Sequence, residues 1–91
     1  YYRTKSGREV DFIVLRPARA RSLCQVCESM ADPQTRKREV AALDEAMTEL
    51  GLKTGTLVTR TESERIATRS GTISVVPIWR FLLDPVPPQK Q

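Results

Sequence analysis

The chain has 91 residues, of which 40% are hydrophobic and 29% are charged, and its formal net charge is +4. This length supplies one small core and excludes a second one. No run approaches the roughly 20 apolar residues of a membrane helix, and no apolar leader indicates secretion, so we expect a cytoplasmic protein without a membrane partner. The positive charge permits contact with nucleic acid phosphates, and it equally suits a solvated basic surface.

The first third of the chain predicts three strands. Residues 1–5 and 9–15 are rich in strand-forming residues and flank Ser6-Gly7, a turn signal, which predicts a hairpin. Pro17 breaks the chain after the hairpin, because proline has no N–H for a ladder and disfavours helix in the residue before it. A third strand is expected at 22–28.

A helix is predicted over residues 33–50. Asp32-Pro33 has the pattern of an N-cap followed by the first helical position, and Gly51 stands where a C-cap glycine belongs. Apolar residues recur at the three- and four-residue steps of one helical face: Val40, Leu43, Met47 and Leu50. This is the most clearly specified element of the sequence.

The last third predicts two more strands, at 55–60 and 71–78, separated by a polar stretch. Pro77 should move the end of the last strand to a sheet edge or a bulge. Residues 79–83 suit one closing helical turn, and the proline-rich residues 84–91 form a tail or linker. The order β-β-β-α-β-β predicts an α/β (α+β) fold, with a mixed sheet in one domain over residues 1–83.

The two cysteines, Cys24 and Cys27, have the spacing C-x-x-C. A structural zinc site needs four ligands, and this chain has two cysteines and no histidine. A redox pair needs its first cysteine at a helix N-terminus, whereas this motif lies in a predicted strand. The pattern therefore favours buried thiols that act as small hydrophobic side chains over a metal or redox site.

Two acids lie close together in the second predicted strand. Alternation along that strand would place Glu9 and Asp11 on one face and Val10 and Phe12 on the other. One interpretation is an exposed Glu9 and an Asp11 held by hydrogen bonds at the rim of the sheet. The other is a pair of carboxylates in a functional site.

Basic residues gather in the hairpin, in the loop after it and at the start of the helix. As candidate phosphate contacts of a DNA-binding surface we single out Arg3, Lys5, Arg8, Arg19, Arg21, Arg36, Lys37 and Arg38. For each of them a solvated surface charge is the alternative.

Five segments together resemble a domain that follows the ATPase module in a large prokaryotic family of AAA+ type ATPases: YYRTKSGREVDFIV, LCQVCES, DPQTRKREVAALDEAMTELGL, GTLVTRTE and ISVVPIWRFLL. That domain is similar to the restriction-endonuclease-like PD-(D/E)xK fold, and the resemblance covers nearly all of residues 1–83. It implies a truncated nuclease core whose usual first helix lies upstream of Tyr1. ATP would bind only in an upstream ATPase module, since this chain has no G-x-x-x-x-G-K loop.

The resemblance also implies a degenerate catalytic site. In the nuclease signature, an Asp on the second strand and an acid-x-Lys on the third hold a divalent cation and help to activate water. Asp11 matches the first acid, whereas Gln25 and Cys27 stand at the positions of the second acid and the Lys. Glu9 is the nearby residue that could supply another acid. Magnesium or manganese would therefore be held weakly, chiefly by Asp11.

Three functions are compatible with these observations. Our leading hypothesis is a non-catalytic nuclease-like module of an AAA+ type ATPase that acts in DNA binding or in assembly with the ATPase domain. The second is an active metal-dependent DNA nuclease that uses Asp11 with Glu9 or Gln25. The third is a protein-interaction domain that dimerises through an exposed sheet edge or through residues 79–83.

Overall fold

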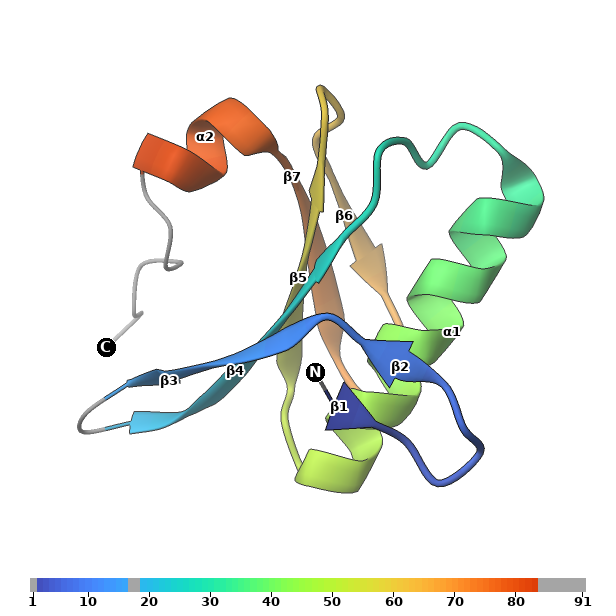
Figure 1. Ribbon diagram of the computed structural model, residues 1–91, viewed down its shortest axis with the longest axis vertical. Coiled ribbons are helices and arrows are strands. Elements are labelled where there is room, and N and C mark those ends of the chain that lie inside the picture. Colours follow the sequence, from blue (N-terminus) through green and yellow to red (C-terminus); the bar gives the residue numbers. More distant parts are fainter. Residues whose placement is uncertain (1, 17–18, 84–91) are drawn as a thin grey trace.

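The computed structural model describes residues 2–16 and 19–83, which form a small mixed α/β domain (Figure 1). The elements in chain order are β1 (Tyr2–Arg3), β2 (Glu9–Val10), β3 (Phe12–Arg16), β4 (Arg19–Val26), α1 (Pro33–Leu50), β5 (Thr54–Thr59), β6 (Glu64–Ala67), β7 (Thr72–Pro77) and α2 (Ile78–Leu83). The predicted tail, 84–91, and the predicted break at Pro17 lie outside the described residues. No helix in the described ranges has the length and apolar character needed to cross a membrane.

The main sheet is mixed, as the sequence predicts. Its five strands have the order β3-β4-β5-β7-β6, in which β4, β5 and β7 are parallel and the outer strands β3 and β6 are antiparallel to their neighbours. A parallel pair needs a long crossover connection, and α1 supplies it between β4 and β5. The strands β1 and β2 form a separate two-stranded sheet.

The predicted helix is confirmed residue for residue as α1. Its N-cap, Asp32, accepts a hydrogen bond from the backbone N–H of Thr35 at 2.9 Å through Oδ2. Its C-cap, Gly51, has a φ of 70°, a left-handed conformation that glycine adopts without steric cost. Figure 1 shows α1 along one side of the sheet and α2 on the other side, near the carboxyl ends of β5 and β7.

The core lies between α1 and the sheet. Leu57 points into it, whereas its neighbour Val58 points to the opposite face, as alternation along a strand requires. The hairpin of β1 and β2 contributes Val10, which is fully buried. The cluster of buried residues consists of Val10, Leu23, Met30, Leu43, Ala46, Met47, Leu57, Ile73 and Val75.

The prediction of one strand over residues 9–15 is wrong. The chain bends at Asp11, so that β2 pairs with β1 while β3 pairs with β4 in the other sheet. Glu9 and Asp11 therefore do not share the face of one continuous strand. The predicted hairpin around Ser6-Gly7 is confirmed as the pair β1 and β2, and β4 begins at Arg19, three residues before its predicted start.

One strand of the last third is not predicted from the sequence. The polar stretch between the two predicted strands contains β6, with the sequence ERIA, an edge strand that is paired on one side only. The strand β7 is an interior strand as far as Val75, where its pairing with β6 stops. At Pro77 only β5 is paired with it, which agrees with the expectation that proline places this end of the strand at an edge. The predicted closing turn is confirmed as α2.

Candidate functional site

Asp11 lies at the bend between the two sheets, directly beside the end of β4. The register of β3 and β4 pairs Phe12 with Cys24, which brings Asp11 next to Gln25. The Asp11 backbone N–H donates to Gln25 Oε1 at 2.7 Å, and Asp11 Oδ2 accepts a hydrogen bond from the Val26 backbone N–H at 2.8 Å. The Asp11 side chain thus caps the end of the β3–β4 ladder.

Gln25 connects this bend to α1. Its side chain is only 5% exposed, and its Nε2 donates to Glu39 Oε1 at 2.6 Å. The amide oxygen and the amide nitrogen of Gln25 therefore both have partners, one on each side of the side chain. Because a buried polar group is costly unless it is hydrogen-bonded, this arrangement fixes the orientation of the amide.

Glu39 is a site residue that our sequence reasoning missed. Its side chain is 15% exposed, and the Arg38 guanidinium lies 3.6 Å from its Oε2. A signal was present in the sequence, because Glu39 precedes Leu43, Ala46 and Leu50 at the steps of the inward helical face. An acid in an apolar helical stripe needs a polar partner in the protein interior, and here that partner is Gln25.

The polar atoms around Asp11 are directed at one another rather than at a common point. Hard cations in proteins take oxygen ligands, several of them anionic and all directed at one point. At this bend the Gln25 oxygen is directed at the Asp11 N–H, and the amide hydrogens of Gln25 are directed at Glu39. Asp11 Oδ2 is directed at the Val26 N–H. Internal hydrogen bonds thus engage the Gln25 oxygen and Asp11 Oδ2, two of the atoms that would have to face a metal.

The two cysteines are free, and they point to opposite faces of the sheet. Cys24 is 2% exposed, and burial together with the nearby Asp11 charge raises the pKa of its thiol to about 12. Cys27 packs against the core beneath α1 and donates to the Ser29 carbonyl at 3.2 Å. Burial raises the pKa of the Cys27 thiol as well. Both side chains are therefore neutral thiols at physiological pH.

Glu9 belongs to the hairpin rather than to the bend at Asp11. It lies opposite Arg3 in the pairing of β1 with β2, and its Oε2 is 3.1 Å from Arg3 Nη2. Both side chains are more than half exposed. The structure thus uses Glu9 as one member of a surface ion pair.

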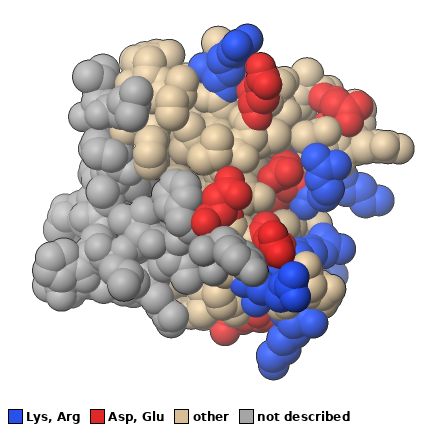
Figure 2. Space-filling model, in the orientation of Figure 1, with Lys and Arg blue, Asp and Glu red and all other residues tan. Residues whose placement is uncertain are grey.

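Four of the predicted phosphate contacts are paired with acids on the surface of the protein. Arg3 is paired with Glu9, and Arg8 Nε lies 3.4 Å from Glu45 Oε1. The other two pairs are Arg36 with Glu64 and Arg38 with Glu39. Figure 2 shows the same mixture, with acidic and basic side chains next to one another on the described part of that face.

The remaining four predicted contacts have different surroundings. Lys5 lies beside Glu49, whose pKa its charge helps to lower, and Lys37 is an exposed residue of α1. The side chains of Arg19 and Arg21 lie outside the described part of the structure. The described basic residues thus do not form a patch free of acids.

Large apolar side chains are exposed at the carboxyl ends of the parallel strands. Val26 ends β4 and is 51% exposed, and α2 begins directly after β7 with Ile78 and Trp79, which are 39% and 59% exposed. Since β4, β5 and β7 run parallel, these residues lie at the same end of the sheet. Three large exposed apolar side chains at one end of the sheet make this end a candidate interaction surface.

Comparison of the chain with protein-family models, with curated proteins and with solved structures finds no match in any of the three.

Proposed function

We propose that this domain is a nuclease-like module without catalytic activity, and that it serves an AAA+ type ATPase in assembly or in DNA binding. The likeness to the PD-(D/E)xK domain of such ATPases rests on the sequence segments named above. The arrangement of elements is compatible with it, because an antiparallel pair, β3 and β4, is followed by a helical crossover to the parallel strand β5. ATP binding would belong to the ATPase module.

One observation carries the proposal, namely the position of the Gln25 amide. It stands where the nuclease signature has its second acid, and hydrogen bonds to the Asp11 backbone and to Glu39 occupy both of its ends. Cys27 stands where the signature has its Lys, and a neutral thiol cannot stabilise developing negative charge as an ammonium group does. The same residues thus make a structural junction in place of a catalytic one.

Assembly is the activity that the surface supports better. Val26, Ile78 and Trp79 expose apolar surface at one end of the sheet, whereas four of the eight predicted phosphate contacts are paired with acids. Tryptophan is strongly represented among the residues that dominate binding energy at protein interfaces. DNA binding remains the second candidate, and the net charge of +4 favours it.

A cleavage assay tests the catalytic part of the proposal. The chain is incubated with labelled duplex DNA and manganese, beside Asp11→Ala and beside a double variant, Gln25→Glu with Cys27→Lys, which restores the nuclease signature. We expect no cleavage by the unchanged chain or by Asp11→Ala. Manganese-dependent cleavage that disappears in Asp11→Ala would contradict the proposal and would make the protein a nuclease.

Salt dependence separates the two binding activities. DNA affinity falls steeply with rising salt when phosphate contacts dominate, whereas apolar association does not. Sedimentation of the unchanged chain and of Trp79→Ser, at low and at moderate salt, measures association between copies through this end of the sheet. We expect association that persists at moderate salt and weakens in Trp79→Ser, with an exposed-site variant, Lys37→Ser, as the matched control. Salt-sensitive DNA binding without self-association would favour the DNA-binding candidate.

A further inference from the structure

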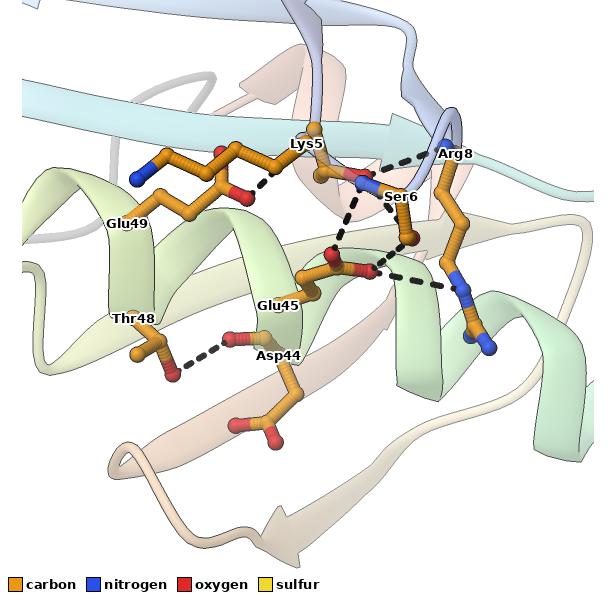
Figure 3. Close-up of polar contacts among 8 residues, drawn as sticks. Lys5, Ser6, Arg8, Asp44, Glu45, Thr48 and Glu49 are labelled. Carbon is orange, nitrogen blue, oxygen red and sulfur yellow. Dashed lines mark hydrogen bonds and ion pairs between the residues drawn. The ribbon is translucent and has the colours of Figure 1, made fainter.

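The turn between β1 and β2 holds two carboxylates of α1, as Figure 3 shows. The Lys5 backbone N–H donates to Glu49 Oε2 at 2.8 Å. The Ser6 backbone N–H donates to Glu45 Oε2 at 3.3 Å, and the Ser6 hydroxyl donates to Glu45 Oε1 at 2.8 Å. Two successive backbone N–H groups and a hydroxyl therefore point at negatively charged oxygens, which is the pattern of an anion-binding concavity.

Neighbouring side chains complete this set of donors. Arg8 Nε lies 3.4 Å from Glu45 Oε1, and the Tyr2 hydroxyl donates to Glu49 Oε1 at 2.6 Å. The Tyr2 and Lys5 hydrogen bonds, with the Lys5 charge, hold the pKa of Glu49 below its ordinary value. The turn itself is set by Gly7, whose φ of 94° favours glycine and whose N–H donates to the Thr4 carbonyl at 2.9 Å.

The charges on the two elements are complementary. The hairpin carries Arg3, Lys5 and Arg8 against the single acid Glu9, which leaves an excess of two positive charges. Glu45 and Glu49 are one helical turn apart, a spacing at which like charges repel each other. The two acids are thus unfavourable for the isolated helix, and their neutralising partner is the hairpin.

The donors lie at the surface of the protein. Lys5, Ser6 and Arg8 are exposed residues, and the side chains of Arg8 and Glu45 are 47% and 27% exposed. Carboxylates and phosphates are both oxyanions that accept charge-assisted hydrogen bonds from backbone N–H, hydroxyl and guanidinium groups. A phosphate can therefore use the donors that the two carboxylates occupy.

We propose that the β1–β2 turn is a phosphate-binding site for a nucleic acid backbone, and that Glu45 and Glu49 of α1 mask it. The backbone phosphates compete with the two carboxylates for the N–H groups of Lys5 and Ser6, the Ser6 hydroxyl and the Arg8 guanidinium. The masked site keeps the DNA affinity of the unchanged chain low. This inference rests on the DNA-binding candidate of the proposed function and does not require the nuclease likeness.

Removal of the masking carboxylates is the direct test. Binding of a short labelled duplex is measured by fluorescence anisotropy for the unchanged chain and for Glu45→Ala with Glu49→Ala. We expect the double variant to bind the duplex at least about tenfold more tightly. Its affinity should also fall more steeply with rising salt, by the amount that corresponds to about two additional phosphate contacts. Addition of Arg8→Ala should remove most of that gain.

A matched control separates the site from the change in net charge. Glu28→Ala with Glu64→Ala also removes two acids, which are paired with Arg60 and Arg36 and lie outside the hairpin contacts. We expect this control to gain clearly less affinity than the hairpin variant. An equal gain in both variants, or no gain in Glu45→Ala with Glu49→Ala, would overturn the proposal.

Two further measurements keep the test decisive. If the alanine variant does not fold by circular dichroism, Glu45→Gln with Glu49→Gln removes the charges and keeps an acceptor oxygen for the turn. Its DNA affinity is compared with that of Glu28→Gln plus Glu64→Gln, and again an equal gain in both variants would overturn the proposal.

Inorganic phosphate serves as competitor, and we expect it to displace the duplex far less well per phosphate than unlabelled DNA does. Equal competition would identify a free anion as the ligand and would overturn the assignment to nucleic acid.

Discussion

Carboxylates of α1 hold the β-structure at two places, and the two differ in their exposure to water. At one place Glu39 accepts a hydrogen bond from the amide of Gln25, which is 5% exposed. At the other, Glu45 and Glu49 accept hydrogen bonds from the exposed turn of the hairpin. At the first place one buried amide, that of Gln25, makes the contact. At the second place several exposed donors of the hairpin turn make it.

The difference in exposure determines whether water can replace a lost hydrogen-bond partner. If an exposed hydrogen bond is lost, water takes the place of the missing partner, so that the net cost is small. A buried group that loses its partner keeps its full desolvation penalty. We therefore expect the Gln25 junction to stabilise the fold and the hairpin contacts to be exchangeable, which is what a masked binding site requires.

Gln25→Leu should lower the free energy of unfolding more than the other substitutions. It leaves Glu39 Oε1 and the Asp11 N–H without their Gln25 partner, and we expect a loss of about 2 to 4 kcal/mol in the free energy of unfolding. Urea denaturation measures it, with Gln34→Leu on the exposed first turn of α1 as the control. A loss no larger than that of the control would show that the junction does not hold the fold.

Glu45→Ala should have a smaller effect. It removes contacts with Ser6 and Arg8 that lie at the surface, and it relieves the repulsion by Glu49. We expect the free energy of unfolding to fall by about 0.5 to 1 kcal/mol in the same urea experiment. A loss as large as that of Gln25→Leu would contradict the distinction between the two places.

Protonation of Glu49, which contacts the hairpin, should change the stability least. The pKa of Glu49 is lowered by hydrogen bonds from Tyr2 and Lys5, so its stabilising contribution is present above its ordinary value of 4.5. That contribution is lost as the pH falls through the lowered pKa of the folded state. The urea midpoints of the unchanged chain and of Glu49→Gln should therefore converge on acidification.

Tyr2→Phe tests the same contact. It removes the hydrogen bond that lowers the pKa of Glu49 most, so a smaller amount of stability should be lost on acidification, over a narrower and less acidic pH range. A gap between the unchanged chain and Glu49→Gln that stayed constant with pH would contradict the assignment.

The elements with strong local signals were predicted well. The helix α1 has an N-cap, an apolar stripe and a C-cap glycine, and it begins and ends where these signals place it. The strand β6 was missed because it has only four residues and two of them, Glu64 and Arg65, are charged. The division of residues 9–15 was missed because the bend at Asp11 depends on hydrogen bonds to Gln25 and Val26, which are distant in sequence.

The candidate site was predicted in part. The sequence resemblance pointed to Asp11 and Gln25, which lie side by side, and to Glu9, which lies in the hairpin beside Arg3. Partners on other elements could not be inferred from spacing. Glu39 contacts Gln25 across 14 residues, and the turn contacts Glu45 and Glu49 across about 40 residues. Such pairings depend on how the helix packs against the sheet.

Under the proposed function, an amide junction at Gln25 stands where the nuclease signature has a metal site. Isothermal titration of the unchanged chain with manganese, beside Asp11→Ala, tests this assignment. We expect the two titrations to be indistinguishable, since Gln25 Oε1 and Asp11 Oδ2 each accept an internal hydrogen bond. Binding of one manganese ion by the unchanged chain, lost in Asp11→Ala, would contradict the claim.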